Sequence, residues 1–360
     1  MRTGFSTSAC AAAAVAAGIQ TLAGQQPLQT VVIDLPAKKQ VAFTLHRCEL
    51  TSEAVRCGVI KDAGDDPDVT NGLEIQAVVR WMETPGIVIL GGEGVGRVTL
   101  PGLPVAVGEA AINPGSRKLI LRAARAAISR YAAARQRGIE ITIHVPEGER
   151  IAQQTMNPKL GIVGGISILG TDGLVRPYSA AAFRTSLYYE LKVASENGYD
   201  CVGLATGKRS SAYLRKVLHD ERGLGVIDAG DELGYPLERM AHMPFTKIVV
   251  GGMIGKLSKL AQGRLQTHVQ QGEVDFDFLS KLAADLEAPA DLCERIQTAR
   301  TAYQVQRWLR ETGIYMEPEI ARLAAVQVFA RLDSRLNVSV YLFSQPGDIL
   351  GQHHIGVNDG

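Results

Sequence analysis

The sequence lacks a surplus of charge of either sign, and aromatic residues are few. Lysine and arginine number 38 and aspartate and glutamate 37, so the formal net charge is +1 at pH 7. A nucleic-acid-binding protein needs a basic surplus and aromatic side chains for the bases, whereas only 6% of these residues are aromatic. We therefore expect no nucleic-acid partner. At 360 residues, the chain is long enough for two domains, each with its own core.

Cysteine is also scarce, and its spacing excludes two cysteine-based structures. The five cysteines are an odd number without a CxxC pair: Cys10, Cys48, Cys57, Cys201 and Cys293. A disulfide framework would use paired cysteines, and a structural zinc site would show short ligand spacings. We therefore expect free thiols in a reducing, cytoplasmic compartment and no metal held by the protein itself.

A long, strongly apolar run is missing as well. Residues 3–33 carry no charge, and the alanine-rich stretch 11–17 could pass for a signal peptide. A signal core is usually rich in leucine, however, and a membrane span needs about 20 strongly apolar residues. The stretch favours a closely packed helix over about 8–24, capped by Ser8, and no membrane partner.

The first half of the chain is rich in strand patterns. Runs of β-branched residues bounded by Gly, Pro and Asp predict strands over 31–35, 41–50, 55–60, 75–82 and 87–90. Pro114 can open a helix that runs to about Gln136, with Gly138 as its stop. A strand over 139–145 then leads into a glycine-rich segment, 161–173. Strands with few crossovers predict an α+β domain over residues 1–172.

The second half alternates strands and helices. Ser179 can cap a helix that ends near residue 197, and three apolar strands are expected over 201–204, 225–227 and 247–250. Each strand ends in a small-residue turn and is followed by a helical pattern. This order predicts a Rossmann-like α/β domain over 173–360, with a mostly parallel sheet and its ligand at the strands' carboxyl ends.

The C-terminal part predicts helices over about 291–332 and a last strand over 336–343. His353 and His354, near the end of the chain, are expected in a solvated tail rather than as ligands.

An acidic segment, 61–72, holds four carboxylates in seven residues: Asp62, Asp65, Asp66 and Asp68. Such a density of like charge is costly unless the groups are solvated, hydrogen-bonded or bound to metal. The segment lacks EF-hand spacing, and its Gly, Asp and Pro residues commonly build turns. We favour a turn scaffold with a ligand-facing carboxylate over a metal site.

Three glycine clusters could belong to nucleotide-binding loops. The cluster at 91–96 follows a strand, but Val98, Thr99 and two prolines prevent a helix from opening at once. The segment 161–173 alternates glycine with apolar residues, as strands and tight loops do. The cluster at 251–256 lies between a strand and a helix without the spacing of a phosphate loop. A close approach to a small ligand and a purely structural turn both remain open there.

Basic residues gather in the helix expected after Pro114. Lys118, Arg122 and Arg125 share one flank of it, in a stretch without acidic residues. This flank could hold a polycarboxylate substrate or could be a solvated helix face. No catalytic triad, nucleophile elbow or HExxH motif is present. Cys10 near a helix start could be a reactive thiol, although a buried packing residue is more common.

Several long motifs carry a family resemblance. They are RTGFST at 2–7 with Cys10, KDAGDDPDVTN at 61–71, GGEGVGRVT at 91–99, VGEAAINP at 107–114 and NPKLGIVGGISILGT at 157–171. Weaker ones are ATG at 205–207, GDELGY at 230–235, IGKLSKLAQG at 254–263, and the pair at 267–268. Together these motifs resemble those of the cobalt-precorrin-5B (C1)-methyltransferase family of the oxygen-independent cobalamin pathway.

The resemblance implies transfer of a methyl group from S-adenosyl-methionine to C1 of cobalt-precorrin-5B, which gives cobalt-precorrin-6A. The cobalt belongs to the substrate macrocycle, so no protein metal site is implied. The many acetate and propionate arms of such a substrate call for basic side chains and for amides, including those at 6–8. The adenosine of the donor is expected over the glycine turns at the strand ends.

Expected roles follow from this resemblance. Substrate binding is expected from Arg2, Thr3, Thr7, Lys61, Asp68, Asn113, Arg117, Lys118, Ser167 and Thr171. Catalytic roles are expected from Asp62, Asp65, Asp66 and His268. Donor binding is expected from Thr206, Gly207, Gly230, Asp231, Gly251 and Gly252.

The chain departs from the family pattern at Met253, where the family has histidine. This departure leaves open a methyltransferase that acts on another modified tetrapyrrole. A second alternative is a non-catalytic corrinoid-binding protein, which would not need the donor site that the glycine turns suggest. A homo-oligomer is compatible with the sequence.

Overall fold

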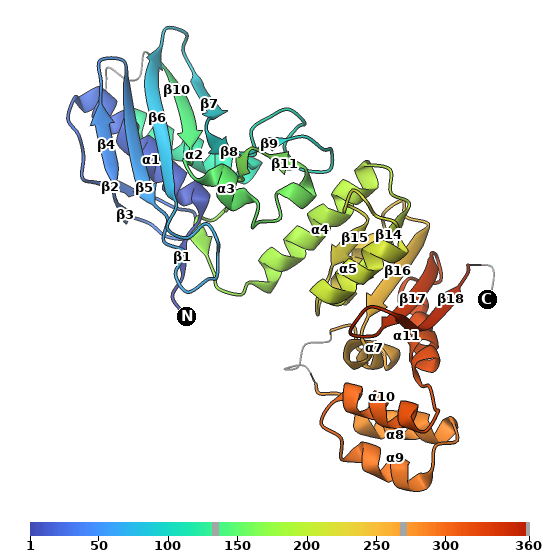
Figure 1. Cartoon of the computed structure of the whole chain (residues 1–360). Coiled ribbons are helices and arrows are strands. Elements are labelled where there is room, and N and C mark those ends of the chain that lie inside the picture. The colour runs from blue at the N-terminus through green and yellow to red at the C-terminus, as the bar shows by residue number, and fades with distance from the viewer. Residues whose placement is uncertain (132–136, 267–271, 358–360) are drawn as a thin grey trace. The chain divides into compact units, whose positions relative to one another are not determined.

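The computed structural model describes residues 1–131, 137–266 and 272–357. Its contacts divide the chain into two compact units, Met1–Ala180 and Ala181–Gly360 (Figure 1). The division falls eight residues beyond the boundary expected after residue 172. The reason is that β13 (Leu174–Val175) pairs with β1 (Gly4–Phe5), which holds the end of the glycine-rich segment to the first unit. Each unit is described by itself.

The first unit is built on a five-stranded mixed sheet with the order β4-β5-β6-β10-β7. The strands are β4 (Arg47–Leu50), β5 (Ala54–Ile60), β6 (Glu74–Met82), β10 (Gly138–His144) and β7 (Ile87–Gly91). Neighbours are antiparallel except β10 and β7, which are parallel. Helix α1 (Thr7–Gly24) packs on β5 and β6 and against α2 (Pro114–Ile128) (Figure 1).

Short elements complete the first unit. Strand β2 (Thr30–Ile33) pairs with β3 (Val41–Thr44), β8 (Gly94–Val95) with β12 (Gly165–Ile166), and β9 (Arg97–Val98) with β11 (Ile162–Val163). Helix α3 (Gly148–Ala152) and a 3-10 turn (Pro158–Leu160) lie between β10 and β11. The cluster at 91–96 contains β8 and is followed by β9. As expected, no helix opens directly after it.

Helix α1 is the central element of the first core, and 15 of its 18 residues are buried. Its alanines allow a close approach to the sheet, and a Cβ added at Gly18 would lie 2.7 Å from Cγ2 of Val79. By length and composition α1 could also cross a membrane, yet 83% of the tested window is buried inside the protein. The expectation of a closely packed helix is confirmed.

The cap of α1 is Ser6, so the expectation that Ser8 caps it is wrong. The Ser6 hydroxyl accepts a hydrogen bond from Ala9 N at 3.2 Å, as an N-cap residue does. Ser8 lies inside the first turn, and its hydroxyl donates to Gly170 O instead.

Two further expectations for the first unit are corrected. The strand expected over 41–50 is broken into β3 and β4 around Leu45, and each part pairs with a different neighbour. The helix expected to run to Gln136 ends at Ile128, where Ser129 caps its last turn. Gly138 is the first residue of β10, where an added Cβ would collide with the backbone oxygen of Thr84. That close approach explains the glycine.

The second unit has a five-stranded sheet with the order β15-β14-β16-β17-β18. Strands β14 (Cys201–Ala205), β15 (Val226–Asp228), β16 (Lys247–Gly252) and β17 (Asn337–Phe343) are parallel, and β18 (Ile349–Ile355) is an antiparallel edge. Helices cover both faces: α5 (Lys208–Val217) one side, and α4 (Ala180–Glu196), α6 (Gly234–Met240), α7 (Ile254–Ala261) and α11 (Glu317–Arg331) the other. The alternation of strands and helices expected over 201–261 is confirmed.

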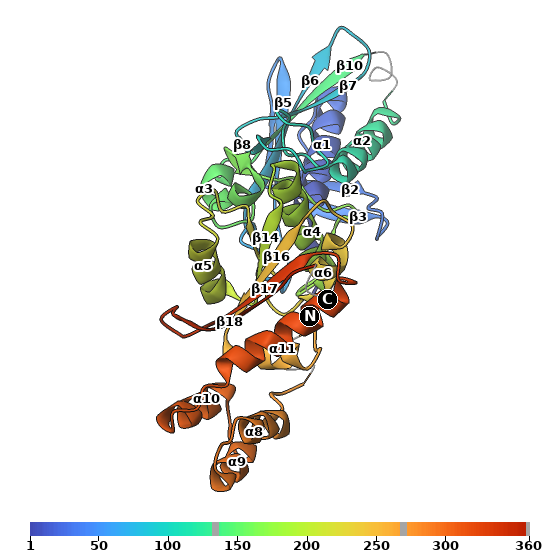
Figure 2. The ribbon, with the colours of Figure 1, turned by 90° about the vertical axis from the view of Figure 1, so that its right-hand side faces the viewer.

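The C-terminal part differs from expectation in two ways. Helix α8 (Phe276–Asp285) precedes the expected helices, here α9 (Ala290–Gln297), α10 (Ala302–Glu311) and α11. Strand β17 is followed by a further strand, β18, where the sequence predicted a solvated tail (Figure 2). Asp348 N donates to Ser344 Oγ at 2.9 Å in the turn between them. Nδ1 of His354 lies 2.7 Å from Ser339 Oγ, so this histidine belongs to the sheet.

The packing of α1 generates a stability prediction. Leucine in place of Ala13, which is fully buried, overfills the contact between helix and sheet and should lower the free energy of unfolding by about 1–3 kcal/mol. The same change at the exposed Ala126 of α2 should alter it by less than about 0.5 kcal/mol. Chemical denaturation measures both, and equal effects would contradict the close packing of α1.

Candidate functional site

One end of the first unit brings together most of the residues expected to bind substrate. Strands β5, β7 and β10 run in the same direction, so the loops after them leave from one edge of the sheet. The bridge between Thr3 and Gly64 joins the N-terminal segment to the acidic segment there. The bond from Asn113 N to Ile168 O (3.2 Å) joins the residue before α2 to the glycine-rich segment. The helix starts of α1 and α2 lie at the same end. We call this region the loop end.

Arg2 is tied to the acidic loop through its side chain and its backbone. Its guanidinium donates to both oxygens of Asp62, at 2.5 and 2.8 Å, and its amide donates to Oδ2 of Asp65 at 2.6 Å. The Arg2 hydrogen bonds, with one from Gly64 N, lower the pKa of Asp62 to about 2. Asp62 is therefore ionised at neutral pH and is a weak proton acceptor.

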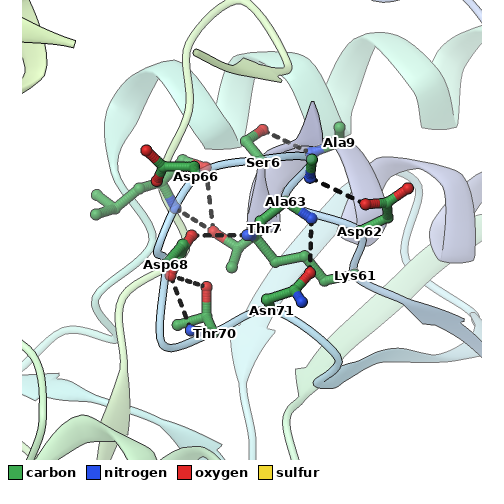
Figure 3. Close-up of polar contacts among 12 residues, drawn as sticks. Ser6, Thr7, Ala9, Lys61, Asp62, Ala63, Asp66, Asp68, Thr70 and Asn71 are labelled. Carbon is green, nitrogen blue, oxygen red and sulfur yellow. Dashed lines mark hydrogen bonds and ion pairs between the residues drawn. The ribbon is translucent and has the colours of Figure 1, made fainter. Parts of the chain in front are cut away.

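Lys61 and Asp68 form an ion pair inside the loop (Figure 3). Nζ of Lys61 lies 2.7 Å from Oδ2 of Asp68, and the Lys61 side chain is only 1% exposed. Oδ1 of Asp68 accepts from Thr70 N at 2.8 Å and from Thr70 Oγ1 at 2.6 Å. Burial opposes the ionisation of Asp68, but the Lys61 and Thr70 hydrogen bonds and the Lys61 charge outweigh it and lower its pKa. The pair anchors the acidic loop.

The other loop residues also hold backbone groups. Oδ1 of Asn71 accepts from Ala63 N at 2.8 Å (Figure 3). Oδ1 of Asp66 accepts from Tyr178 N at 3.1 Å. All four aspartates of the segment therefore have protein partners, as a turn scaffold requires. Among residues 1–131, 137–266 and 272–357, no three His, Cys, Asp or Glu side chains are grouped to hold a metal ion.

The start of α1 is hydrogen-bonded to the glycine-rich segment. Thr7 Oγ1 donates to Leu169 O at 3.1 Å and accepts from Leu169 N at 2.8 Å, and Ser8 N donates to the same carbonyl at 3.0 Å. Of the amides at 6–8 that are expected to receive a substrate carboxylate, those of Ser6 and Ser8 already donate to Gly173 O and Leu169 O in this structure. Cys10 follows in this buried turn, and burial raises the pKa of its thiol to about 12, which favours the packing role.

The start of α2 leaves more groups open. Asn113 is its N-cap residue without a side-chain capping bond, and Thr171 lies against Gly115, where an added Cβ would be 2.8 Å from Oγ1. Lys118 is exposed in the first turns of the helix. Within the part of the chain that the structure describes, the side chains of Asn113, Lys118 and Thr171 form no hydrogen bond. These three groups can meet a ligand.

Two neighbouring residues are already engaged. Arg117 Nη1 donates to Ile89 O at 3.1 Å. Ser167 Oγ donates to Oδ1 of Asn157 at 3.0 Å, in a buried pair that holds the glycine-rich segment. Both side chains shape the loop end in this structure.

In the second unit, the residues expected to bind the donor lie at the carboxyl edge of the sheet. The turns there are bonded to one another: Thr206 N donates to Gly251 O at 3.0 Å, and Gly230 N donates to Ala205 O at 3.2 Å. Lys256 reaches across from α7 and donates to Thr206 O. Backbone is open at two glycines, because an added Cβ at Gly255 would meet nothing within 4 Å. At Gly207 it would meet only Nζ of Lys256, at 4.0 Å.

The acidic residue available at this edge differs from the expected one. Oδ1 of Asp231 lies 3.1 Å from Nζ of Lys256, so Asp231 is already paired. Asp228 is the last residue of β15, is half-buried, and pairs in register with Ala205. Its carboxylate has no hydrogen bond or ion pair among the described residues. Sequence reasoning missed Asp228, although its place about 20 residues after the first turn was a usable signal.

A cavity lies apart from these sites. It has a volume of about 350 Å³, is lined by Tyr199, Cys201, Asp220 and Gly225 among others, and lies where β14 and β15 begin, at the opposite edge of the sheet. Ligands of parallel sheets bind at the carboxyl edge, so we place no site in this cavity. His268, expected to be catalytic, lies outside the described residues.

Comparison with known proteins covers nearly the whole sequence. Two family models match it: CbiD over residues 1–177, and CbiD, C-terminal domain, over residues 266–354. The cobalt-precorrin-5B C(1)-methyltransferase of Geobacillus sp. (strain WCH70) is 39% identical over 98% of this chain and 96% of the relative. The protein of the same name from Picrophilus torridus is 39% identical over 97% and 99%.

One solved structure is also similar. It is a crystal structure of cobalamin biosynthesis protein (cbiD) from Archaeoglobus fulgidus. It is 26% identical, covers 87% of this chain and 85% of that chain, and has a TM-score of 0.40.

The pair of Lys61 and Asp68 predicts an acid-sensitive stability. Because folding lowers the pKa of Asp68, its contribution is present above the ordinary aspartate pKa of about 3.9 and is lost as pH falls through the lower folded value. Asp68→Asn should flatten the fall in unfolding free energy between about pH 5 and pH 2. At pH 7 it should cost about 3 kcal/mol, since it leaves the Lys61 charge buried and unpaired.

The matched control is Asp333→Asn, at an exposed aspartate. Denaturation curves at several pH values measure both variants. A pH profile of Asp68→Asn that matches the wild type would contradict the assigned role of the pair.

Proposed function

This chain belongs to the CbiD family, and on that premise we propose that it is a cobalt-precorrin-5B C(1)-methyltransferase of cobalamin biosynthesis. The observation that carries the proposal is identity of 39–40% to relatives of that name over 98% of the chain. It extends to both units, because the two family models match residues 1–177 and 266–354. The proposed methyl donor is S-adenosyl-methionine.

The donor supplies an electrophilic methyl group on a positively charged sulfur. The transfer forms a bond between C1 of the macrocycle and the methyl carbon and breaks the bond from that carbon to sulfur. The electron pair of the broken bond stays on sulfur, so a neutral thioether leaves and the positive charge passes to the macrocycle. Such a reaction needs alignment and exclusion of water more than a strong base. The cobalt is part of the substrate, so the protein needs no metal ligands of its own for it.

In this proposal the loop end of the first unit binds the macrocycle. Lys118 would pair with a carboxylate arm, while Asn113 and Thr171 would donate hydrogen bonds beside the α2 start, where the helix dipole favours an anion. These groups support the role because their side chains form no hydrogen bond with the residues that the structure describes. The low pKa of Asp62 makes it a weak base, so it is a poor candidate to accept a proton.

The carboxyl edge of the second unit would bind the donor. Four parallel strands with helices on both faces support a Rossmann-like interpretation, in which ligands lie over the turns that follow the strands. The residues present fit an adenosine-bearing donor. Gly207 and Gly255 leave room for close approach to the backbone, and Asp228 offers an unpaired acceptor for hydroxyl groups.

The decisive experiment is a mass measurement. The protein is incubated without oxygen with cobalt-precorrin-5B and methyl-labelled S-adenosyl-methionine, and the product should gain one labelled methyl group. Controls omit the protein or replace the donor by S-adenosyl-homocysteine. A protein that binds the macrocycle but not the donor would be a carrier. If the protein methylates only a different tetrapyrrole, the assigned substrate is wrong, and Met253 is the first residue to examine as the cause.

Lys118 provides a test of the substrate site. Lys118→Ala removes one charge from the proposed carboxylate site and should raise KM for the macrocycle about 3- to 10-fold with little change in kcat. Arg130→Ala, which removes an exposed charge beyond the far end of α2, should change neither value. Steady-state kinetics measures both, and equal KM values for the two variants would remove Lys118 from the site.

A further inference from the structure

An aromatic ring lies beside the turn that follows Asp228, at the carboxyl edge of the second unit. Phe183 is in the first turns of α4, and its side chain stays 40% exposed. Gly230, in the turn after β15, has a left-handed φ of 58°, and a Cβ added there would lie 3.9 Å from Cζ of Phe183. The ring therefore lies beside the turn that begins two residues after Asp228.

Topology explains why an early residue of α4 reaches this edge. Only four residues separate the end of α4 at Glu196 from β14 at Cys201, so the helix runs opposite to the strand. Leu187 and Leu191 pack it onto the sheet. The helix start consequently lies where the parallel strands end.

An ion pair fixes the ring in place. Nε of Arg184, the next residue, lies 2.8 Å from Oε2 of Glu232, in the loop after Gly230. Oε1 of Glu232 accepts from Nε2 of Gln266. This network ties the start of α4 to the loop after β15 and leaves the aromatic face exposed. An exposed aromatic ring held in position at a ligand edge is suited to stacking.

The other acidic groups of this edge are occupied. Asp231 is paired with Lys256, and Glu232 with Arg184. Asp228 alone of these three has no partner among the described residues. A half-buried, unpaired carboxylate gains free energy from charge-assisted hydrogen bonds to hydroxyl groups.

We propose that Phe183 and Asp228 form the adenosine subsite of the donor site, with the ring stacked on the base and the carboxylate accepting the ribose hydroxyls. The inference rests on the proposed function, which needs an adenosine-bearing donor, and adds the residues that recognise it. Stacking tolerates any flat base, whereas the carboxylate distinguishes a ribose from a deoxyribose. Asp228 is thus the residue that sets sugar specificity.

The first test compares S-adenosyl-homocysteine with its 2′,3′-dideoxy analogue by calorimetry on the full chain. The wild type should bind the dideoxy analogue at least about 10-fold more weakly, because two hydrogen bonds to a charged group are lost. In Asp228→Asn the difference between the affinities for the two compounds should shrink to below about 3-fold. Asp285→Asn, at an exposed aspartate of α8, should keep the wild-type ratio.

The second test replaces the ring. Phe183→Leu should weaken binding of S-adenosyl-homocysteine about 10-fold, because it keeps an apolar side chain but loses the stacking face. Phe183→Trp should restore the affinity, and the fluorescence of the new tryptophan should be quenched on binding. Tyr303→Leu, at an exposed aromatic residue of α10, should leave the affinity unchanged. Thermal unfolding checks that each variant is folded.

The outcomes separate the two proposals. The subsite is overturned, and the proposed methyltransferase function is not, if the wild type binds the donor and either of two results is found. One is an Asp228→Asn variant with the wild-type ratio of affinities for S-adenosyl-homocysteine and its dideoxy analogue. The other is a Phe183→Leu variant with the wild-type affinity for S-adenosyl-homocysteine. A wild type that binds neither S-adenosyl-methionine nor S-adenosyl-homocysteine, with or without macrocycle, overturns both. The subsite is supported if Asp228→Asn no longer distinguishes the ribose from the dideoxyribose analogue, and if Phe183→Leu weakens donor binding while Phe183→Trp restores it.

Discussion

The close contact between α1 and the sheet of the first unit sets the positions of all the loops at the loop end. Alanine side chains let the helix axis approach the strands, and the start of α1 then lies level with the ends of β5 and β10. From there, Thr7 holds Leu169 with two hydrogen bonds, and Ser6 N donates to Gly173 O at 3.0 Å. A wider helix would displace the glycine-rich segment together with the acidic loop, since both are bonded to the residues around its start.

The two candidate sites differ in how their polar groups are used. At the loop end, the four aspartates and Lys61 are bonded within the protein, so they maintain the shape of the site. The groups left open, such as Lys118, lie at its margin. At the carboxyl edge of the second unit, by contrast, the Asp228 carboxylate has no hydrogen bond or ion pair with any described residue, and Phe183 is 40% exposed. The residues that hold the shape of a site are therefore different from the residues that are left to contact a ligand. This arrangement suits a reaction whose rate depends on how substrate and donor are positioned.

The sequence predicted the local elements better than the details of the sites. Periodicity located α1, the strands of the first sheet and the alternation after residue 200, because burial on one face leaves a regular pattern. It missed β18, whose histidines and glutamine look like a tail until Ser339 and the neighbouring strand supply partners. It favoured Asp231 over Asp228, because the pairing of Asp231 with Lys256 depends on a turn-to-turn contact that no local pattern encodes. The role of Lys61 was hidden for the same reason, since its burial depends on how the loop folds back over it.

The burial of Lys61 also affects how the surface chemistry of this protein can be interpreted. An amine whose side chain is 1% exposed is closed to acylating reagents in the folded chain, whereas Lys118 is open to them. Acetyl groups placed on the folded protein would therefore collect on the lysine at the margin and spare the one beneath the acidic loop. Labelling of Lys61 would then report transient opening of that loop, whereas labelling of Lys118 would report the accessibility of the folded surface.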